Sequence, residues 1–306
     1  MTKKYYLGID TSNYRTSVAV CDSEGNTLAS VRRLLKVAEG ERGLRQSDAL
    51  FLHTVALPEI MREIGNYPLS AVGYSAYPRD VEGSYMPCFL AGKSVAESIA
   101  ALNGIPAYHF SHQSGHVRAA AYSCGGVKNS PDRFIAFHVS GGTTEILLSE
   151  NGKTTLLGGS EDLHAGQLID RVGVAMGMTF PCGEEMEKLA NNVPTVKGIK
   201  ICVKGLNCNL SGIENQAINR FKKGEAPETV SAFTLDAVLK TLIKLSENVR
   251  SLYPDLPILY AGGVMSCKRL QTALKKIGNC YFATPELSGD NAVGIALLTM
   301  ESQAEN

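Results

Sequence analysis

Three histidines lie within eight residues of this chain, in the segment AYHFSHQSGHVRAAAYS. His112 and His116 are four residues apart where the sequence predicts a helix, so both imidazoles would lie on one face and could bind one metal ion. A paired surface or core role is an equal alternative for such a pair. Residue 113 is glutamine, so the glutamate of the zinc-peptidase motif HExxH is absent and a metallopeptidase is the weakest interpretation.

Two glycine pairs suggest a second kind of chemistry. Gly141–Gly142 and Gly262–Gly263 each follow an apolar run that is typical of a buried strand. Glycine in such turns allows close backbone approach or a positive φ, and the exposed N–H groups can bind phosphate. Ordinary tight turns are the alternative. Two pairs in this order favour a nucleotide site.

The elements that would position these residues repeat along the chain. Residues 4–21 read as strand, turn and strand, and residues 26–31 predict a third strand. Residues 134–152 repeat the strand–turn–strand pattern, as a repeat of structure rather than of sequence. Further strands are predicted at 69–76, at 105–110 and before Gly262. Helices are predicted at 46–64, 92–103, 111–123, 162–177, 227–252 and 266–277, and from Asp290 onward.

This order predicts a two-lobed α/β fold of the actin, Hsp70 and sugar-kinase type, with a ligand cleft between the lobes. The first lobe would comprise residues 1–128, with the metal-binding helix, and the returning helix 290–306. Residues 129–289 would form the second, nucleotide-binding lobe. The only clear linker candidate is near 125–131.

Composition restricts the classes of partner and compartment. The 306 residues contain 30 Lys+Arg and 30 Asp+Glu, so the formal net charge is zero and binding of nucleic acid by bulk charge is excluded. The eight cysteines form no CxxC motif, which indicates reduced thiols. No apolar run is long enough to span a membrane, and no signal peptide precedes Asp10. We therefore expect a cytoplasmic protein without a membrane partner.

Six separated motifs give a family resemblance over about residues 5–298. They are GIDTS, SHQSGH, VSGGTTE, the stretch from Gly158 to Gly183, AGGV and DNAVGIA. In this order they resemble the TsaD/Gcp family of tRNA N6-threonylcarbamoyladenosine synthases, formerly called O-sialoglycoprotein endopeptidases. The resemblance implies an acyltransferase that moves threonylcarbamoyl from threonylcarbamoyl-AMP to adenosine 37 of tRNA. It also implies accessory proteins as partners.

The resemblance further implies the site residues. One iron or zinc ion would be held by His112, His116 and Asp290, and would act as a Lewis acid on the carbonyl under attack. The adenylate would be bound by the loop, by a ribose-binding aspartate and by residues of later turns. The matching positions are His138, Val139, Ser140, Gly141, Gly142, Asp170, Gly183, Gly262, Gly263 and Cys267.

Departures from the family pattern concentrate in the first loop. The family sequence there is roughly ETSCDET, whereas this chain has Tyr14 and Arg15 in place of the acidic pair. Asp10 and Arg15 are then the candidate catalytic residues, and Arg15 would suit an anionic ligand. The alternative is that Tyr14 and Arg15 simply face solvent. The family's SGGHT histidine is Thr143, and its adenine-binding asparagine is Cys267.

Three alternative functions follow from these departures. The first is a divergent paralogue that uses another carbamoyl- or acyl-adenylate or another acceptor. The second is an ATPase or kinase of the same fold, which needs Mg²⁺ and an acidic residue, Asp10 or Glu145. The third is a non-catalytic partner of the true synthase. A tRNA modifier also needs a basic stripe, and the candidates are Arg32–Arg33, Lys197–Lys204, Arg220–Lys223 and Lys268–Lys276.

Overall fold

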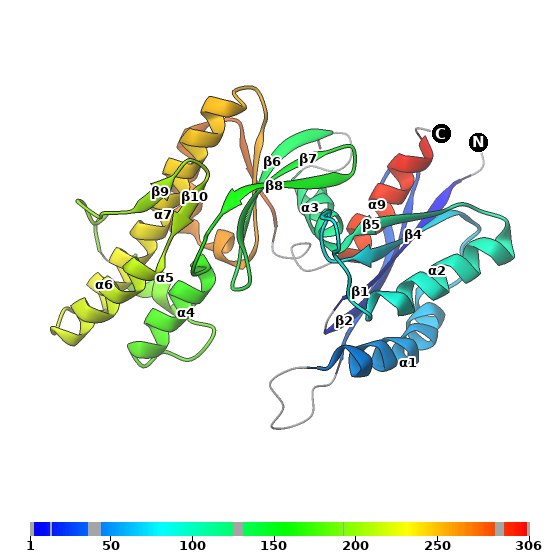
Figure 1. The fold of residues 1–306 in the computed structure, drawn as a ribbon, viewed down its shortest axis with the longest axis horizontal. Coiled ribbons are helices and arrows are strands. Elements are labelled where there is room, and N and C mark those ends of the chain that lie inside the picture. The colour runs from blue at the N-terminus through cyan, green and yellow to red at the C-terminus, as the bar shows by residue number, and fades with distance from the viewer. Residues whose placement is uncertain are drawn as a thin grey trace. The chain divides into compact units, whose positions relative to one another are not determined.

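The chain divides into two compact units, drawn in Figure 1. Unit 1 comprises Met1–Asp132, Ser149–Thr155 and Glu286–Asn306, and unit 2 comprises Arg133–Leu148 and Leu156–Pro285. The computed structural model describes residues 3–12, 14–35, 44–124, 131–191, 193–284 and 291–304. The short segment Ser149–Thr155 is the tip of a hairpin whose strands begin and end in unit 2.

Unit 1 is built on a five-stranded sheet in the order β3-β2-β1-β4-β5. The first three strands are antiparallel neighbours, and β4 and β5 run parallel to β1. The strands are β1 Tyr5–Ser12, β2 Arg15–Asp22, β3 Thr27–Leu34, β4 Leu69–Tyr77 and β5 Ala107–Ser111.

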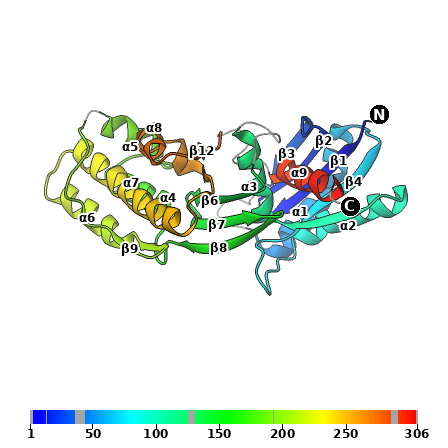
Figure 2. The ribbon, with the colours of Figure 1, turned by 90° about the horizontal axis from the view of Figure 1, so that it is seen from above.

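The two faces of this sheet are covered by different helices. Leu7 and Ile9 point to the face covered by α1 (Gln46–Ile64) and α2 (Phe89–Asn103), whereas Tyr6 points to α9 (Asn291–Ala304). Figure 2 shows α9 along the sheet, near α3 (His112–Ser123). At Gly8 a Cβ would lie 2.2 Å from the Ala292 carbonyl oxygen, so glycine allows α9 to rest directly on β1. Side chains alternate along a strand, so Asp10 belongs to the α9 face.

Unit 2 repeats this strand order with other residues. Its sheet is β12-β11-β6-β7-β8, and β11 runs parallel to both of its neighbours. When β6, β7, β8, β11 and β12 are matched to β1, β2, β3, β4 and β5, the two orders are identical, so the predicted structural repeat is confirmed. The strands are β6 Arg133–Val139, β7 Thr144–Glu150, β8 Lys153–Gly159, β11 Ile258–Ala261 and β12 Cys280–Phe282.

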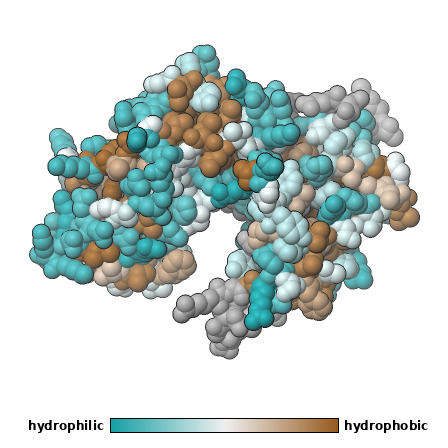
Figure 3. Space-filling model, viewed as in Figure 1, coloured by the Kyte–Doolittle hydropathy of each residue, from teal (hydrophilic) through white to brown (hydrophobic). Residues whose placement is uncertain are grey.

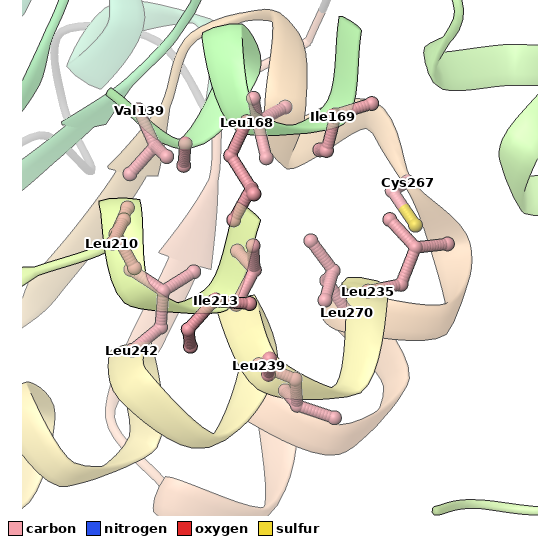
Figure 4. Packing of buried hydrophobic residues seen from close by; sticks show 14 of the residues in the cluster. Val139, Leu168, Ile169, Leu210, Ile213, Leu235, Leu239, Leu242, Cys267 and Leu270 are labelled. Atoms are coloured by element: carbon pink, nitrogen blue, oxygen red, sulfur yellow. The ribbon is translucent and has the colours of Figure 1, made fainter. Parts of the chain in front are cut away.

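The helices of unit 2 pack around one hydrophobic core. In Figure 4, leucines from α4 and α7 meet residues from the start of α6. Ile169, Leu235 and Cys267 lie at one edge of this core. The remaining elements are α4 Ala165–Ala175, α5 Gly183–Ala190, β9 Cys202–Lys204, β10 Asn207–Asn209, α6 Ser211–Lys222, α7 Pro227–Leu252, η2 Gly263–Ser266, α8 Lys268–Leu274 and η3 Lys275–Ile277.

Several predicted elements agree with the structure, and others need correction. The helices predicted at 46–64 and 227–252 are confirmed to the residue. The helix predicted at 266–277 is wrong as one element, because the extended backbone of Cys267 separates η2 from α8. The prediction missed α5 and α6, in each of which only two residues are buried, so the apolar periodicity is weak. Within the described residues, no helix has the length and apolarity to cross a membrane.

Candidate functional site

The β6–β7 loop of unit 2, residues 140–143, is joined to the start of α4. The N–H of Gly166 donates to the Ser140 carbonyl oxygen at 3.0 Å. The N–H of Ala165 donates to Thr144 Oγ1 at 2.8 Å. A Cβ at Gly166 would lie 2.6 Å from the Gly141 nitrogen, so only glycine permits this approach. The loop is thereby held at the positive end of a helix dipole.

Hydrogen bonds inside the loop make it rigid. Ser140 Oγ accepts from the N–H groups of Gly142, at 3.2 Å, and of Thr143, at 3.1 Å. Thr143 Oγ1 lies 2.8 Å from Ser140 Oγ and 3.3 Å from His138 Nδ1. Thr143 therefore connects the His138 ring to the loop.

A cavity of about 490 Å³ opens beside this loop, and we call it the Asp170 cavity. Its volume lies in the range of small-molecule sites. Of the predicted residues, five line it: Gly141, Asp170, Gly183, Gly263 and Cys267. Ile169, Leu235 and Val264 give it apolar walls, and Figure 4 shows the first two at the edge of the core. No sequence motif pointed to these three apolar residues or to the other five lining residues, which are Gly166, Pro181, Glu184, Glu187 and Ser266.

The other predicted loop residues do not line the Asp170 cavity. His138, Val139, Ser140, Gly142 and Gly262 are absent from its described lining. Val139 is fully buried in the core of unit 2. Ser140 and Gly142 belong to the loop but do not form the wall of the cavity.

The glycine prediction requires a correction. Gly262 has φ +100°, and a Cβ there would lie 2.3 Å from the Val139 carbonyl oxygen. At Gly141, Gly142 and Gly263, by contrast, φ is not positive and a Cβ would meet no atom within 4 Å. The protein itself therefore demands glycine only at Gly262. The open space at Gly141 and Gly263 lies on the wall of the cavity.

The Asp170 carboxylate is fixed by the turn that follows α4. Its Oδ1 accepts from the N–H of Cys182 at 2.8 Å, and the Cys182 thiol donates to the Asp170 carbonyl oxygen at 3.5 Å. Burial, followed by the negative charge of Asp170, raises the pKa of the Cys182 thiol. Cys182 therefore stays protonated and serves as a hydrogen-bond donor at neutral pH.

The lining of the Asp170 cavity also contains Cys267 and Glu187. Glu187 Oε1 accepts from the N–H of Arg269 at 3.1 Å, and the Arg269 guanidinium makes two 2.9 Å bonds to Asp236. This network ties α5, α7 and α8 together behind the cavity wall. Burial raises the pKa of Cys267 to about 12, so a neutral thiol lines the cavity here. No Lys or Arg appears in the described lining, which contains three carboxylates.

In unit 1 the predicted metal ligands stand at the start of α3. Ser111 Oγ caps this helix by accepting from the N–H of Ser114 at 2.9 Å. His112 Nδ1 lies 2.7 Å from Asp10 Oδ2 and 2.8 Å from Asn291 Nδ2. The rings of His112 and His116 are 4.5 Å apart between centroids. The structure thus brings Asp10 to His112, whose ring lies beside that of His116, a grouping that the sequence did not predict.

Two oxygen atoms of this cluster fit a cation. Asp10 Oδ1 and Asn291 Oδ1 are buried, and no described residue gives either a hydrogen bond. Acceptor oxygens in this state are satisfied by an ion or a water molecule. Within the described ranges, no three His, Cys, Asp or Glu side chains group as metal ligands. Asp290, the predicted third ligand, lies outside the described residues.

Asp80 fixes the start of α3 through its carboxylate. Its Oδ2 accepts from Ser111 Oγ at 2.8 Å, from Ser114 Oγ at 2.6 Å, and from Thr154 through N–H at 3.0 Å and Oγ1 at 2.8 Å. Asp80 therefore joins the first turn of α3 to the hairpin tip within unit 1. No local pattern marks Asp80 for this role, because Thr154 is 74 residues away along the chain.

The first loop contains the other catalytic candidate. Arg15 begins β2, where it pairs in register with Ser12, and Tyr14 is 43% exposed. The Tyr14 carbonyl oxygen accepts from the N–H of Leu35 at 2.7 Å. A role for Arg15 in anion binding stays a prediction.

Comparison with known proteins shows a family match over most of the chain. The family model TsaD, described as tRNA N6-adenosine threonylcarbamoyltransferase, matches residues 59–297. A protein of that name from Streptococcus thermophilus is 30% identical and covers 97% of this chain and 91% of its own length. One from Methanopyrus kandleri is 26% identical, with 95% and 85% covered. A probable bifunctional tRNA threonylcarbamoyladenosine biosynthesis protein of Thermoplasma acidophilum is 26% identical, and only 54% of its length is covered.

Solved structures show the fold alone. Full-length HypF in its phosphate- and nucleotide-bound form matches 98% of this chain and 56% of its own, with TM-score 0.65 and 12% identity. The ROK hexokinase of Thermus thermophilus matches with TM-score 0.54 and 14% identity, and covers 99% of this chain and 100% of its own. The fold is therefore of the actin, Hsp70 and sugar-kinase type, as predicted.

Proposed function

Since this chain belongs to the TsaD family of tRNA N6-adenosine threonylcarbamoyltransferases, we propose that it transfers a threonylcarbamoyl group from an acyl-adenylate to adenosine 37 of tRNA. The observation that carries the proposal is the Asp170 cavity, in which a fixed carboxylate, apolar walls and a rigid glycine loop meet. These are the groups that a nucleoside monophosphate requires.

The cavity supports one orientation of the adenylate. The Asp170 carboxylate would accept hydrogen bonds from the ribose hydroxyls, as carboxylates do in nucleotide folds. The adenine would lie between Ile169 and Leu235, toward the neutral thiol of Cys267. The phosphate would lie at Gly141, near the N-terminus of α4. Three carboxylates and no lining cation favour a monophosphate over a polyphosphate.

The transfer itself balances without a further reactant. The N6 amine attacks the carbamoyl carbon, a C–N bond forms, and the bond from that carbon to the phosphate oxygen breaks to release AMP. The amine loses one proton. A metal ion held by His112 and His116 would supply Lewis acid activation of the carbonyl.

Asp10 would act through His112. A carboxylate that accepts from one imidazole nitrogen orients the ring, so a metal would have to be bound by the other nitrogen, Nε2, which here lies 3.2 Å from Asn291 Nδ2. At 2.7 Å from His112 Nδ1 and 1% exposed, Asp10 suits this orienting role better than that of a general base. The same contact weighs against the ATPase or kinase alternative, in which Asp10 would have to hold Mg²⁺ and water. Glu145, its other acidic candidate, is a buried residue of β7.

The test measures AMP binding by calorimetry and the modified nucleoside in tRNA from a strain depleted of its own synthase. We expect wild type to bind AMP and restore the modification, and Asp170→Ala to lose both. Asp255→Asn, a change at an exposed carboxylate of the same unit, is the matched control and is expected to behave as wild type. Failure of stable wild-type protein to bind AMP would contradict the proposal.

A further inference from the structure

A second cavity, of about 630 Å³, opens along the neighbouring face of α4. We call it the Phe180 cavity. Gln167, Asp170, Arg171 and Val174 of α4 contribute to its wall, three and four residues apart, so they share one face of the helix. In Figure 3, hydrophobic and hydrophilic residues are mixed on the surface around α4. The function proposed above leaves this cavity unused.

Two residues line both cavities, so the two cavities adjoin each other at these residues. Gly141 and Asp170 belong to each lining, whereas Cys267 and Leu235 belong only to the Asp170 cavity. In the proposed orientation, the shared residues hold the ribose and phosphate of the adenylate. The Phe180 cavity therefore adjoins the end of the adenylate that carries the acyl group, and this is the end that an acceptor amine must reach.

The lining of the Phe180 cavity has the chemistry of a base-stacking site. The side chain of Phe180 is 70% exposed and that of Val174 is 54% exposed, so apolar surface is left open to solvent. An exposed aromatic ring stacks any nucleobase, and such stacking does not depend on bulk charge. This suits a chain with zero net charge.

Arg171 adds a cation at the same place. Its guanidinium lies 3.4 Å from Glu214, and its side chain is 57% exposed. Arg171 is the exposed member of this pair, because the Glu214 side chain is only 17% exposed, and a guanidinium has further N–H groups with which it could donate to a phosphate. Phe180 and Arg171 together present a ring for a base and a charge for the adjoining phosphate.

We propose that the Phe180 cavity receives an unstacked base of a single-stranded RNA loop, with the base on the Phe180 ring and a backbone phosphate on Arg171. This rests on the function proposed above, because it assigns the acceptor side of the same reaction. Donor and acceptor would then occupy adjoining cavities along α4, which meet at Asp170 and Gly141.

The experiment compares variants of the full-length protein. The probe is a fluorescent RNA hairpin that carries the anticodon loop of a tRNA, and its affinity is measured by anisotropy. Phe180→Ala is expected to weaken RNA binding roughly tenfold, and Phe180→Tyr to retain it. Arg171→Gln is expected to lower the slope of log affinity against log salt by about 0.7. AMP binding should be unchanged in all three variants.

Matched controls come from the same unit. Leu252→Ala removes an apolar side chain of similar exposure, and Lys244→Gln removes an exposed cation, both on α7 and outside the cavity. Neither should alter RNA binding.

The inference is overturned if Phe180→Ala binds RNA as wild type does, or if Leu252→Ala weakens binding equally. It is also overturned if wild type binds no RNA. In each case AMP binding is measured as well. If AMP still binds and Asp170→Ala abolishes this binding, the RNA-binding inference has failed while the proposed adenylate site stands. If Phe180→Ala loses AMP binding as well, its effect on RNA is not specific. In that case Arg171→Gln decides: if its slope of log affinity against log salt equals that of wild type, the RNA-binding role of the Phe180 cavity is refuted.

Discussion

The β1–β2 loop of unit 1 and the β6–β7 loop of unit 2 occupy the same place in two sheets of identical strand order. In unit 2, small residues let the loop rest on the start of α4, where Gly166 leaves room for Gly141. In unit 1 the strand ends at Ser12, which pairs with Arg15, and Tyr14 projects from the turn. In unit 2 the loop lies beside the Asp170 cavity, whereas in unit 1 the candidate groups Asp10 and His112 lie at the strand end and on α3. Position in the fold therefore does not decide function, because the side chains at the loop do.

The largest expected effect tests whether the histidines of unit 1 bind a metal needed for transfer while unit 2 binds the adenylate. His112→Ala and His116→Ala should lose bound iron or zinc and lower the transfer rate on the order of a hundredfold or more. AMP affinity should stay as in wild type, because the Asp170 cavity is lined by unit 2 alone. Metal analysis and calorimetry on the same samples provide the measurement. Full metal content in both variants would break the comparison.

The next effect concerns the support of α3 in unit 1. Asp80→Ala leaves the hydroxyls of Ser111 and Ser114 and the Thr154 amide without their acceptor. Hydrogen bonds of this kind contribute about 1 kcal/mol each, so unfolding free energy should fall by about 2–3 kcal/mol. Chemical denaturation measures the change, and Glu82→Gln, at an exposed position of the same loop, is the control. Equal free energies of unfolding for the two variants would show that the Asp80 hydrogen bonds do not stabilise the fold.

A steric change tests the contact between the β6–β7 loop and α4 in unit 2. Gly166→Ala places a Cβ 2.6 Å from the Gly141 nitrogen, so it should cost about 2 kcal/mol through overpacking and weaken AMP binding. Gly212→Ala is the matched control, because Gly212 is likewise the second residue of its helix and a Cβ there would meet no atom within 4 Å. Unchanged AMP affinity in Gly166→Ala would mean that the loop is not fixed by this contact.

The smallest expected effect concerns Asp162, which lies in unit 2 between β8 and α4. Burial alone would raise the pKa of Asp162, but bonds from Ser211 Oγ and from the N–H groups of Leu210 and Leu163 lower it to about 2. An acid whose pKa is lower in the folded state stabilises the fold above its unfolded pKa, near 4, and loses that contribution as pH falls toward 2.

Asp162→Asn should therefore lower the free energy of unfolding at pH 7 on the order of 1 kcal/mol, a value reduced for solvent screening at this exposed residue. Denaturation curves between pH 2 and pH 7 provide the measurement. The difference from wild type should disappear toward pH 2. A difference that is constant over this range would assign the effect to packing instead.

The sequence allowed prediction of whatever depends on local pattern. The limits of α1 and α7 follow from apolar periodicity, and the repeated strand order follows from two strand–turn–strand segments. The Ser111 cap of α3 follows from a local preference of serine. The family motifs placed five residues that line one cavity.

What the sequence could not supply depends on pairs that are distant along the chain. Glu187 reaches the N–H of Arg269 across 82 residues, and Asp10 reaches His112 across 102. No local pattern encodes such contacts, so the role of Glu187 and the orienting role of Asp10 appear only in three dimensions. Phe180 was missed because an exposed aromatic residue in a turn has no periodicity to mark it.

The packing of α9 on β1 has a consequence for biosynthesis. On the chain, α9 follows the whole of unit 2, yet it covers the sheet face of unit 1 that carries Tyr6 and Ala19. A ribosome therefore releases every residue of unit 2 before that face can be buried. During translation unit 2 can fold as a complete body, while the growing chain carries an open apolar sheet upstream. This uncovered surface is where a chaperone would be needed until α9 emerges.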